Sequence, residues 1–305
     1  MDDRLELNEI PTAENIVMLT GWRQWADAGS VSSGLPEYII QQTGARKIGA
    51  IKPDDFYFFQ VPGAHHLLRP VISIKDGYPQ SLETKSNEFY YAGDAEKGLV
   101  IFLGDEPHMH ETAYAQAYFE AVKRLNVSQI AGVAGVYASV PYVQDRQLSC
   151  IYSLPAMRDS LARLAVTFSN YEGGTSIGSY LVTVATAANI PFFVFYGLIP
   201  AYSFGQTALG PHGVSIENDF KAWYDIVRRF NHYFELGLDV TDLQKRSEEL
   251  IVALDKKLLE LEEKFPQLNV GEFMDELEEN FTEVPFMPLD DVWEQEFRNL
   301  FDDLE

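Results

Sequence analysis

The first residues whose types could do chemistry follow a short apolar run at residues 16–19. Behind that run come Gly21, Arg23, Trp25 and Asp27. In a loop between a strand and a helix, Arg23 could hold an anion, Trp25 could stack on a ring, and Asp27 could act as a general acid or base. The alternative is a loop that packs against its own domain. The glycine spacing fits neither a dinucleotide fingerprint nor a P-loop.

A second group follows the apolar run at residues 99–103, where the sequence reads Gly-Asp-Glu-Pro-His-Met-His-Glu from Gly104. Glu106 is a further candidate for acid–base chemistry. Carboxylates beside His108 and His110 also permit a metal-binding interpretation. Histidines two positions apart do not share a helix face, and acidic residues before a helix are favoured by its dipole. We therefore expect no metal here, and no motif indicates a cofactor.

The stretch Gly174–Gly178 matches the G-x-S-x-G pattern of serine hydrolases, with Ser176 in the position of the nucleophile. A nucleophile elbow needs a strand directly before its first glycine, but the preceding apolar run ends at Phe168. A base would have to come from His212 or from His232, and His232 lies within a helical pattern. The alternative is a glycine-rich turn in which Ser176 caps the next helix.

The candidate ligand-pocket residues lie in loops at the ends of predicted strands, which is the usual functional edge of an α/β sheet. They are Gly21, Arg23, Trp25, Asp27, Glu106, Tyr171, Gly173 and Ser176. These residues do not form a complete set of nucleophile, base and orienting group. The sequence therefore favours a binding protein over an enzyme and leaves catalytic residues unassigned.

Residues 1–235 alternate short apolar runs with helical patterns, which predicts an α/β core domain with a mixed sheet flanked by helices. The expected strands are 16–19, 48–51, 55–61, 71–74, 99–103, 130–136 and 191–196, and the expected helices are 35–40, 112–125, 154–164 and 177–188. Residues 236–305 form a second part, an acidic and all-helical C-terminal extension.

In the extension, residues 240–305 carry twenty acidic and six basic side chains. We expect helices that start near Thr241 and Asn269, each opened by a capping box, and a final helix over 289–304. The first helix has an apolar stripe of Ile251, Leu254, Leu258, Leu261 and Phe265. This spacing suits packing against another helix, either of the same domain or of another subunit.

Composition narrows the class of protein. The chain has 305 residues, 46% of them hydrophobic, and a formal net charge of −23. So acidic a surface repels phosphate backbones and anionic lipid, which argues against a nucleic-acid partner. No apolar run is long enough to span a membrane, and Cys150, the single cysteine, cannot form an internal disulfide. We expect a cytoplasmic protein.

Several short motifs, in their order along the chain, resemble the proteasome assembly chaperone 2 family and in particular its bacterial branch. They are Gly21-Trp22, residues 25–29, Asp55-Phe56-Tyr57, Arg69-Pro70, residues 104–108, Tyr171-Glu172-Gly173, Ser176-Ile177, Ile190-Pro191 and residues 194–202. The set covers nearly the whole chain. Relatives often carry a His-Thr-Arg-Pro type stretch where this chain has residues 137–142, so a polar function at that loop is not expected.

The resemblance implies a nucleoside-phosphorylase-like fold and, for eukaryotic and archaeal members, a role in chaperoning or binding proteasome subunits. It implies no settled activity for the bacterial branch. We expect a non-catalytic assembly or interaction protein, a homo-oligomer with a protein client. The alternative is a phosphorylase-like enzyme or a protein that binds a nucleoside or an anion in the strand-end loops.

Overall fold

The computed structural model describes residues 3–60, 69–207, 210–282 and 286. The chain divides into two compact units. Unit 1 comprises Met1–Val136, Cys150–Met157 and Phe168–Gly197, and unit 2 comprises Tyr137–Ser149, Arg158–Thr167 and Leu198–Glu305. Each unit is described by itself below. The expected boundary between residues 235 and 236 stays a prediction.

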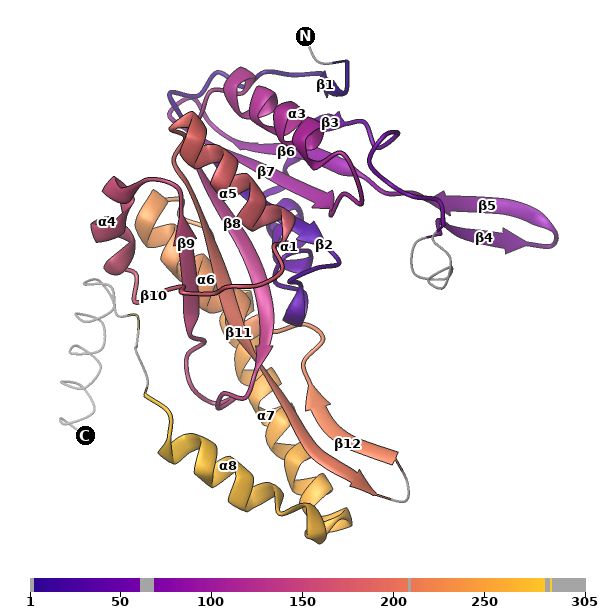
Figure 1. The fold of residues 1–305 in the computed structure, drawn as a ribbon, viewed down its shortest axis with the longest axis vertical. Helices are drawn as coiled ribbons and strands as arrows, with labels where there is room; N and C mark the ends of the chain where they lie inside the picture. The colour runs from indigo at the N-terminus through magenta and orange to yellow at the C-terminus, as the bar shows by residue number, and fades with distance from the viewer. Residues whose placement is uncertain (1–2, 61–68, 208–209, 283–285, 287–305) are drawn as a thin grey trace. The chain divides into compact units, whose positions relative to one another are not determined.

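The main sheet is mixed, as the sequence predicts. Its strand order is β1-β3-β6-β7-β2-β8-β11-β9-β10, with β12 paired to β11 (Figure 1). The central strand β2 runs parallel to β7 and β8, whereas the β1–β3, β3–β6, β6–β7 and β11–β12 pairs are antiparallel. The strands are β1 Leu5–Leu7, β2 Asn15–Arg23, β3 Arg46–Ile51, β6 Asn87–Gly93, β7 Lys97–Asp105, β8 Val127–Ala138, β9 Leu148–Tyr152, β10 Thr167–Phe168, β11 Phe192–Thr207 and β12 Gly210–Ser215.

Helices cover both faces of the sheet in unit 1. Alternate residues of β2 point to opposite sides of the sheet, so the strand packs against a helix on each side. Ile16, Met18 and Trp22 join the core cluster that includes side chains of α3 and α5. On the other face, Gly21 lies against the start of α1, where a Cβ would overlap the Ser32 carbonyl oxygen. The elements are η1 Ala28–Ser30, α1 Gly34–Thr43, α3 Glu111–Arg124, η2 Pro155–Met157 and α5 Ile177–Ala188.

One expected strand is absent. Residues 55–60 of the predicted strand 55–61 form turns and loop, and residue 61 lies outside the described residues. Phe56 is buried edge-on against Tyr114 of α3, with ring centroids 5.2 Å apart. Phe58 and Phe59 are exposed, so a single ring of this aromatic-rich run is fully buried in the core, and it reaches the core from a loop. The composition of the run does not distinguish this arrangement from a strand.

A separate two-stranded sheet in unit 1 is formed by β4 Val71–Lys75 and β5 Tyr78–Glu83. Every residue of both strands is exposed. In Figure 1 this hairpin extends away from the main sheet of its unit.

Unit 2 contains α4 Arg158–Ala162, α6 Phe220–Phe234, α7 Thr241–Lys264, η3 Pro266–Leu268 and α8 Val270–Glu279. The helices α7 and α8 confirm the helical character of the extension as far as the structure describes it. Leu254 and Leu258 of the predicted stripe are buried, so this stripe packs within its own chain. The expected helix 289–304 lies outside the described residues. Every helix in the described ranges is too short or too polar to traverse a bilayer.

Both expected capping boxes of the extension are wrong in detail. Thr241 is the first residue of α7, and its hydroxyl donates to Asp239 Oδ1 over 2.7 Å. Asn269 does occupy the N-cap position of α8, but in a left-handed conformation and without a side-chain cap bond. The Thr241 hydroxyl bonds to the carboxylate of Asp239, which precedes the helix. A hydrogen bond to an ionised acceptor is stronger than one between neutral groups.

Candidate functional site

The predicted site residues that follow β2 are held by the chain's own groups. Asp27 Oδ1 accepts from the backbone N–H groups of Ser32 and Ser33 at 2.8 and 2.9 Å, and its Oδ2 accepts from the Ser33 hydroxyl at 2.7 Å. Burial raises the pKa of Asp27, and these hydrogen bonds act against the rise. This carboxylate therefore shapes the turn before α1.

Arg23 lies at the end of β2 and faces the end of β7. Its Nη1 is 3.6 Å from Asp105 Oδ2, and its side chain is 37% exposed. Asp105 is buried and also accepts from Lys85 Nζ at 3.0 Å and from the Ser86 N–H at 2.9 Å. Two cations, Arg23 and Lys85, thus share the buried carboxylate of Asp105.

Glu106 directly follows β7 and hydrogen-bonds to the start of α5. Its Oε1 accepts from the N–H of Ile177, the first residue of α5, at 2.7 Å. The helix N-terminus that the glycine-rich turn offers to an anion is therefore occupied by this carboxylate. Burial raises the pKa of Glu106, and hydrogen bonds from the backbone of Ile177 and Trp25 oppose that rise. The second oxygen, Oε2, is enclosed and has no hydrogen-bond partner among the described residues.

Ser176 is the N-cap of α5 and forms a capping box with Ser179. Its Oγ accepts from the Ser179 N–H at 3.3 Å and lies 3.3 Å from the Tyr196 hydroxyl. In the described part of the chain no histidine hydrogen-bonds to it. The geometry is that of a helix cap, as the second interpretation of this sequence predicts, and it lacks the base that a serine nucleophile requires.

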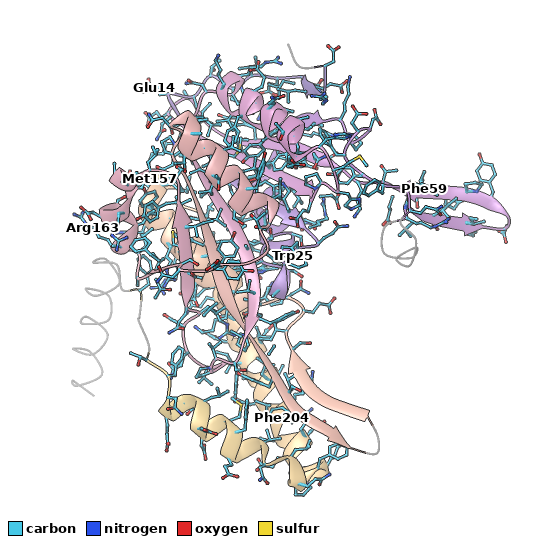
Figure 2. All side chains as sticks on the ribbon, viewed as in Figure 1. Glu14, Trp25, Phe59, Met157, Arg163 and Phe204 are labelled. Carbon is cyan, nitrogen blue, oxygen red and sulfur yellow. The ribbon has the colours of Figure 1, made fainter. Side chains whose placement is uncertain are left out.

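The rings of the two aromatic candidates take no part in these contacts. Trp25 is 63% exposed and Tyr171 is 75% exposed (Figure 2 labels Trp25). Tyr171 donates to the Gly174 carbonyl oxygen at 3.2 Å, and a Cβ at Gly173 would overlap its hydroxyl. The structure therefore brings Arg23, Glu106 and the start of α5 together, with aromatic side chains exposed on the flanking loops.

A buried hydrogen-bond chain behind this edge was missed by sequence reasoning. Trp22 Nε1 donates to the Tyr114 hydroxyl at 2.9 Å, and that hydroxyl donates to Asn87 Oδ1 at 3.0 Å. Tyr57 donates to the same Asn87 oxygen at 2.8 Å. These residues come from four separate segments, so no local pattern connects them. A polar residue opening an apolar strand, as Asn87 does, is the one available signal.

His108, three residues after the end of β7, holds the backbone of the loop that contains Phe58. Its Nδ1 accepts from the Phe58 N–H at 3.1 Å, which assigns the proton to Nε2. Burial lowers the pKa of His108 and favours the neutral ring. Among the described residues, no group of three or more potential ligands could hold a metal ion.

A model of the PAC2 family matches residues 22–258. The chain belongs to the PAC2 family. This confirms the family predicted from the ordered set of short motifs. A comparison with curated proteins finds no match.

Solved structures share the fold of this PAC2-family chain at low sequence identity. The proteasome-assembly chaperone homologue of Mycobacterium tuberculosis is 20% identical, with a TM-score of 0.67 over 79% of this chain and 94% of that one. A Corynebacterium glutamicum protein of unknown function is 15% identical, with a TM-score of 0.72 over 90% and 96%. An archaeal proteasome activator from Pyrococcus furiosus is 18% identical, with a TM-score of 0.57 over 83% and 97%.

Unit 2 of the PAC2-family chain contains a second set of buried charges that sequence reasoning missed. Arg146 Nε donates to Asp219 Oδ2 at 2.8 Å, and the Arg146 N–H donates to Asp225 Oδ2 at 2.8 Å. Lys221 Nζ donates to Asp145 Oδ1 at 2.7 Å and lies 3.8 Å from Asp225. This network holds the loop after β8, residues 139–147, against α6. Pro141 and Arg146 are the only buried residues of that loop.

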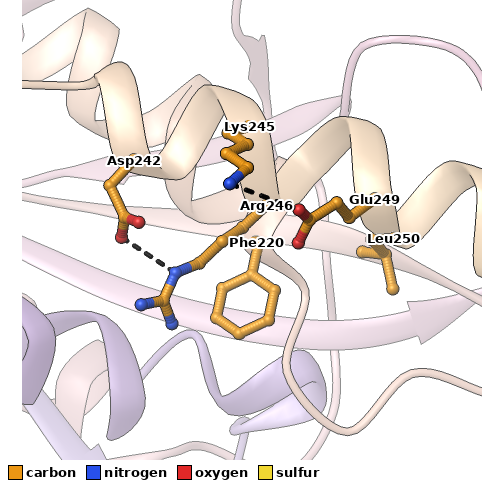
Figure 3. Close-up of a pocket in the computed structure, with 6 residues that line it drawn as sticks. All are labelled: Phe220, Asp242, Lys245, Arg246, Glu249 and Leu250. Atoms are coloured by element: carbon orange, nitrogen blue, oxygen red, sulfur yellow. Dashed lines mark ion pairs between the residues drawn. The ribbon is translucent and has the colours of Figure 1, made fainter.

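A surface pocket of about 470 Å³ lies beside α7 in the same unit (Figure 3). It is lined by Phe220, Asp242, Lys245, Arg246, Glu249 and Leu250. Arg246 pairs with Asp242 at 2.8 Å and Lys245 with Glu249 at 3.8 Å. The charges on its rim are paired with each other along the helix, so the pocket presents no excess charge to a ligand.

Proposed function

We propose that this PAC2-family chain is a non-catalytic assembly or interaction protein that works in the cytoplasm, self-associates and binds a protein client. The proteasome-assembly chaperone homologue and the proteasome activator that share its fold support a role in protein assembly. The net charge of −23 argues against a nucleic-acid partner. The single cysteine, Cys150, is buried and fits a reducing compartment.

The observation that carries the proposal is that the groups predicted to do chemistry hold backbone instead. Asp27 has both oxygens engaged by residues 32 and 33, and Ser176 caps α5. A general base needs an oxygen or nitrogen directed at a substrate proton, and a nucleophile needs such a base beside it. The exposed residues on the same loops, Trp25 and Tyr171, are aromatic, a type enriched at protein–protein contacts.

Affinity capture of the tagged chain from its native cells tests this function, followed by purification of the captured protein and titration. We expect saturable binding that weakens roughly tenfold or more in Trp25→Ala or Tyr171→Ala. Tyr137→Ala is the matched control, because Tyr137 is also exposed, at 55%, but belongs to unit 2. Capture of nothing except copies of the chain itself would refute a client.

A second candidate function is binding of a nucleoside at the end of β7, where Glu106 already occupies the position of an anion. The observation in its favour is that Glu106 Oε2 and His108 Nε2 are enclosed without partners among the described residues. Orphaned buried polar atoms at one edge are typical of sites completed by a ligand or water. Thermal-shift titration with phosphate, nucleosides and nucleotides tests it, because a ligand of the native state must raise the unfolding temperature. No shift with any of them would reject this candidate.

A further inference from the structure

The turn that carries Trp25 has an unfavourable backbone conformation on both sides of that residue. Gln24 adopts a φ of 95° and Ala26 a φ of 53°. Positive φ suits glycine and, among other residues, mainly asparagine and aspartate, because elsewhere the Cβ approaches the following carbonyl oxygen. Neither glutamine nor alanine belongs to this group. Two such residues in one turn persist only where surrounding contacts impose the conformation, and strain of this kind gathers at functional sites.

Glu106 imposes the conformation from the side of β7. Its backbone N–H donates to the Arg23 carbonyl oxygen at 3.4 Å, and its carboxylate accepts from the backbone N–H of Trp25. These two bonds are made to the two peptide groups that flank Gln24, the residue with the larger positive φ. The same carboxylate accepts from the Ile177 N–H at 2.7 Å and so also ties the turn to the start of α5.

The strand β8 holds the other half of the turn. Gly135 donates its N–H to the Ala26 carbonyl oxygen at 2.8 Å and forms an isolated parallel bridge with Asp27. A Cβ on Gly135 would lie 2.0 Å from the Ala28 carbonyl oxygen, so this close approach requires glycine. Residues 23–27 are therefore tied by backbone contacts to both strands that neighbour β2 in the sheet.

The strained turn holds a large ring in solvent. Trp25 is 63% exposed, and Gln24 is exposed beside it. Burial of these side chains therefore does not offset the strain. A ring on a rigid backbone loses little conformational freedom when a partner covers it, and more of the contact energy then appears as affinity. Tryptophan is also a residue type on which binding energy concentrates. Presentation of Trp25 thus accounts for a conformation that packing does not explain.

We infer that Glu106 is a positioning residue for recognition, which holds the strained turn of residues 23–26 in the conformation that presents Trp25 to the client. The inference rests on the client binding proposed above and names the residue that organises this contact. Glu106 also bonds to the N–H of Ile177 at the start of α5, so the experiments separate the two roles.

Exchange of backbone amide hydrogens, resolved by NMR on the full chain, tests the hold on the turn without a client. Glu106→Ala should speed exchange of the Trp25 N–H at least about tenfold, because its acceptor is removed. Glu106→Gln should restore much of the protection, since an amide oxygen still accepts. Ser176→Ala is the control, because it removes the cap of α5 and should leave the Trp25 N–H protected. Unchanged exchange in Glu106→Ala would overturn the inference.

A double-mutant cycle with the captured client tests the link to Trp25. Trp25→Ala and Glu106→Ala should each weaken binding roughly tenfold, and the double variant should bind no more weakly than Trp25→Ala alone, because Glu106 acts through that ring. Losses that add, or unchanged affinity in Glu106→Ala, would overturn the inference while leaving the client in place. A client that Trp25→Ala leaves fully bound would refute the proposed contact itself, and the inference with it.

Gln24→Gly distinguishes presentation from simple stabilisation, and it decides the matter if Glu106→Ala is too unstable to purify. Glycine adopts a positive φ without strain, so the unfolding temperature should be unchanged or higher. The turn becomes more flexible, and affinity for the client should fall roughly threefold or more. A turn that serves stability alone would lose no affinity, so unaltered binding by this variant would contradict the inference.

Discussion

Replacing Asp225 with asparagine should change how the stability of unit 2 depends on pH. Asp225 is fully buried on α6, where Oδ2 accepts from the Arg146 N–H and Lys221 Nζ lies 3.8 Å away. Its other oxygen, Oδ1, has no partner among the described residues. Burial raises the pKa of Asp225 from 3.8 to about 6, and Lys221 opposes the rise. The carboxyl of Asp225 therefore binds its proton more tightly in the folded state than in the unfolded chain.

The sign and size of the effect follow from linkage. A group whose pKa is raised by folding binds its proton more tightly in the folded chain, so its contribution to stability falls as pH rises through the two pKa values. A rise from 3.8 to about 6 corresponds to roughly 3 kcal/mol, lost between about pH 4 and pH 6.5. Asparagine keeps an acceptor for Arg146 and removes this titration.

Urea unfolding followed by far-ultraviolet circular dichroism, at several pH values from 4 to 7, measures the difference. We expect the free energy of unfolding of Asp225→Asn to gain on that of the native protein as pH rises, by an amount approaching ~3 kcal/mol. Asp159→Asn is the control, because Asp159 is an exposed carboxylate of the same unit. A difference between Asp225→Asn and the native chain that stays constant with pH would refute the reasoning.

Further substitutions test the remaining structural assignments. Trp22→Phe removes the donor to Tyr114 but keeps an aromatic ring, and should lower the free energy of unfolding by about 1–3 kcal/mol in urea titrations; an unchanged value would mean that the bond adds nothing. Ser176→Ala should lower it by about 1 kcal/mol through loss of the α5 cap, whereas fluorophosphonate labelling of the native chain that disappears in this variant would contradict the cap-only role. Arg146→Met should lower the free energy of unfolding by about 3–5 kcal/mol, because the carboxylate of Asp219 is left buried without its cation. A smaller loss would show that this ion pair contributes less to stability.

The fold was largely predictable where a single local signal decides the structure. The continuous apolar runs of β2 and β7 predict strands buried on both faces, and both are central in the sheet. The helical spacing over 112–125 and 177–188 is confirmed by α3 and α5. In each of these segments, periodicity and burial agree along one stretch of chain.

Prediction failed where the deciding partner is distant in sequence. Tyr57, Asn87 and Tyr114 meet at one oxygen atom, although the residues come from a loop, a strand and a helix. Arg229 is almost fully buried and is satisfied by carbonyl oxygens of Leu164 and Asp225. Nothing in the residues around these positions indicates such partners, since charged and polar side chains are ordinarily expected at the surface.

The assignment of a ligand pocket to the strand-end loops stays a prediction, and the structure shows what its residues contact. Aspartate, glutamate and serine are the residue types of acid–base chemistry, and they are equally the types that satisfy unpaired N–H groups where a helix begins. Sequence spacing does not separate the two roles, because both require these residues in the loop between a strand and a helix. The distinction comes from what each oxygen contacts.

Here Asp27, Glu106 and Ser176 all contact N–H groups at helix or turn starts. These contacts hold the strand-end loops in place, while the rings of Trp25 and Tyr171 stay exposed beside them.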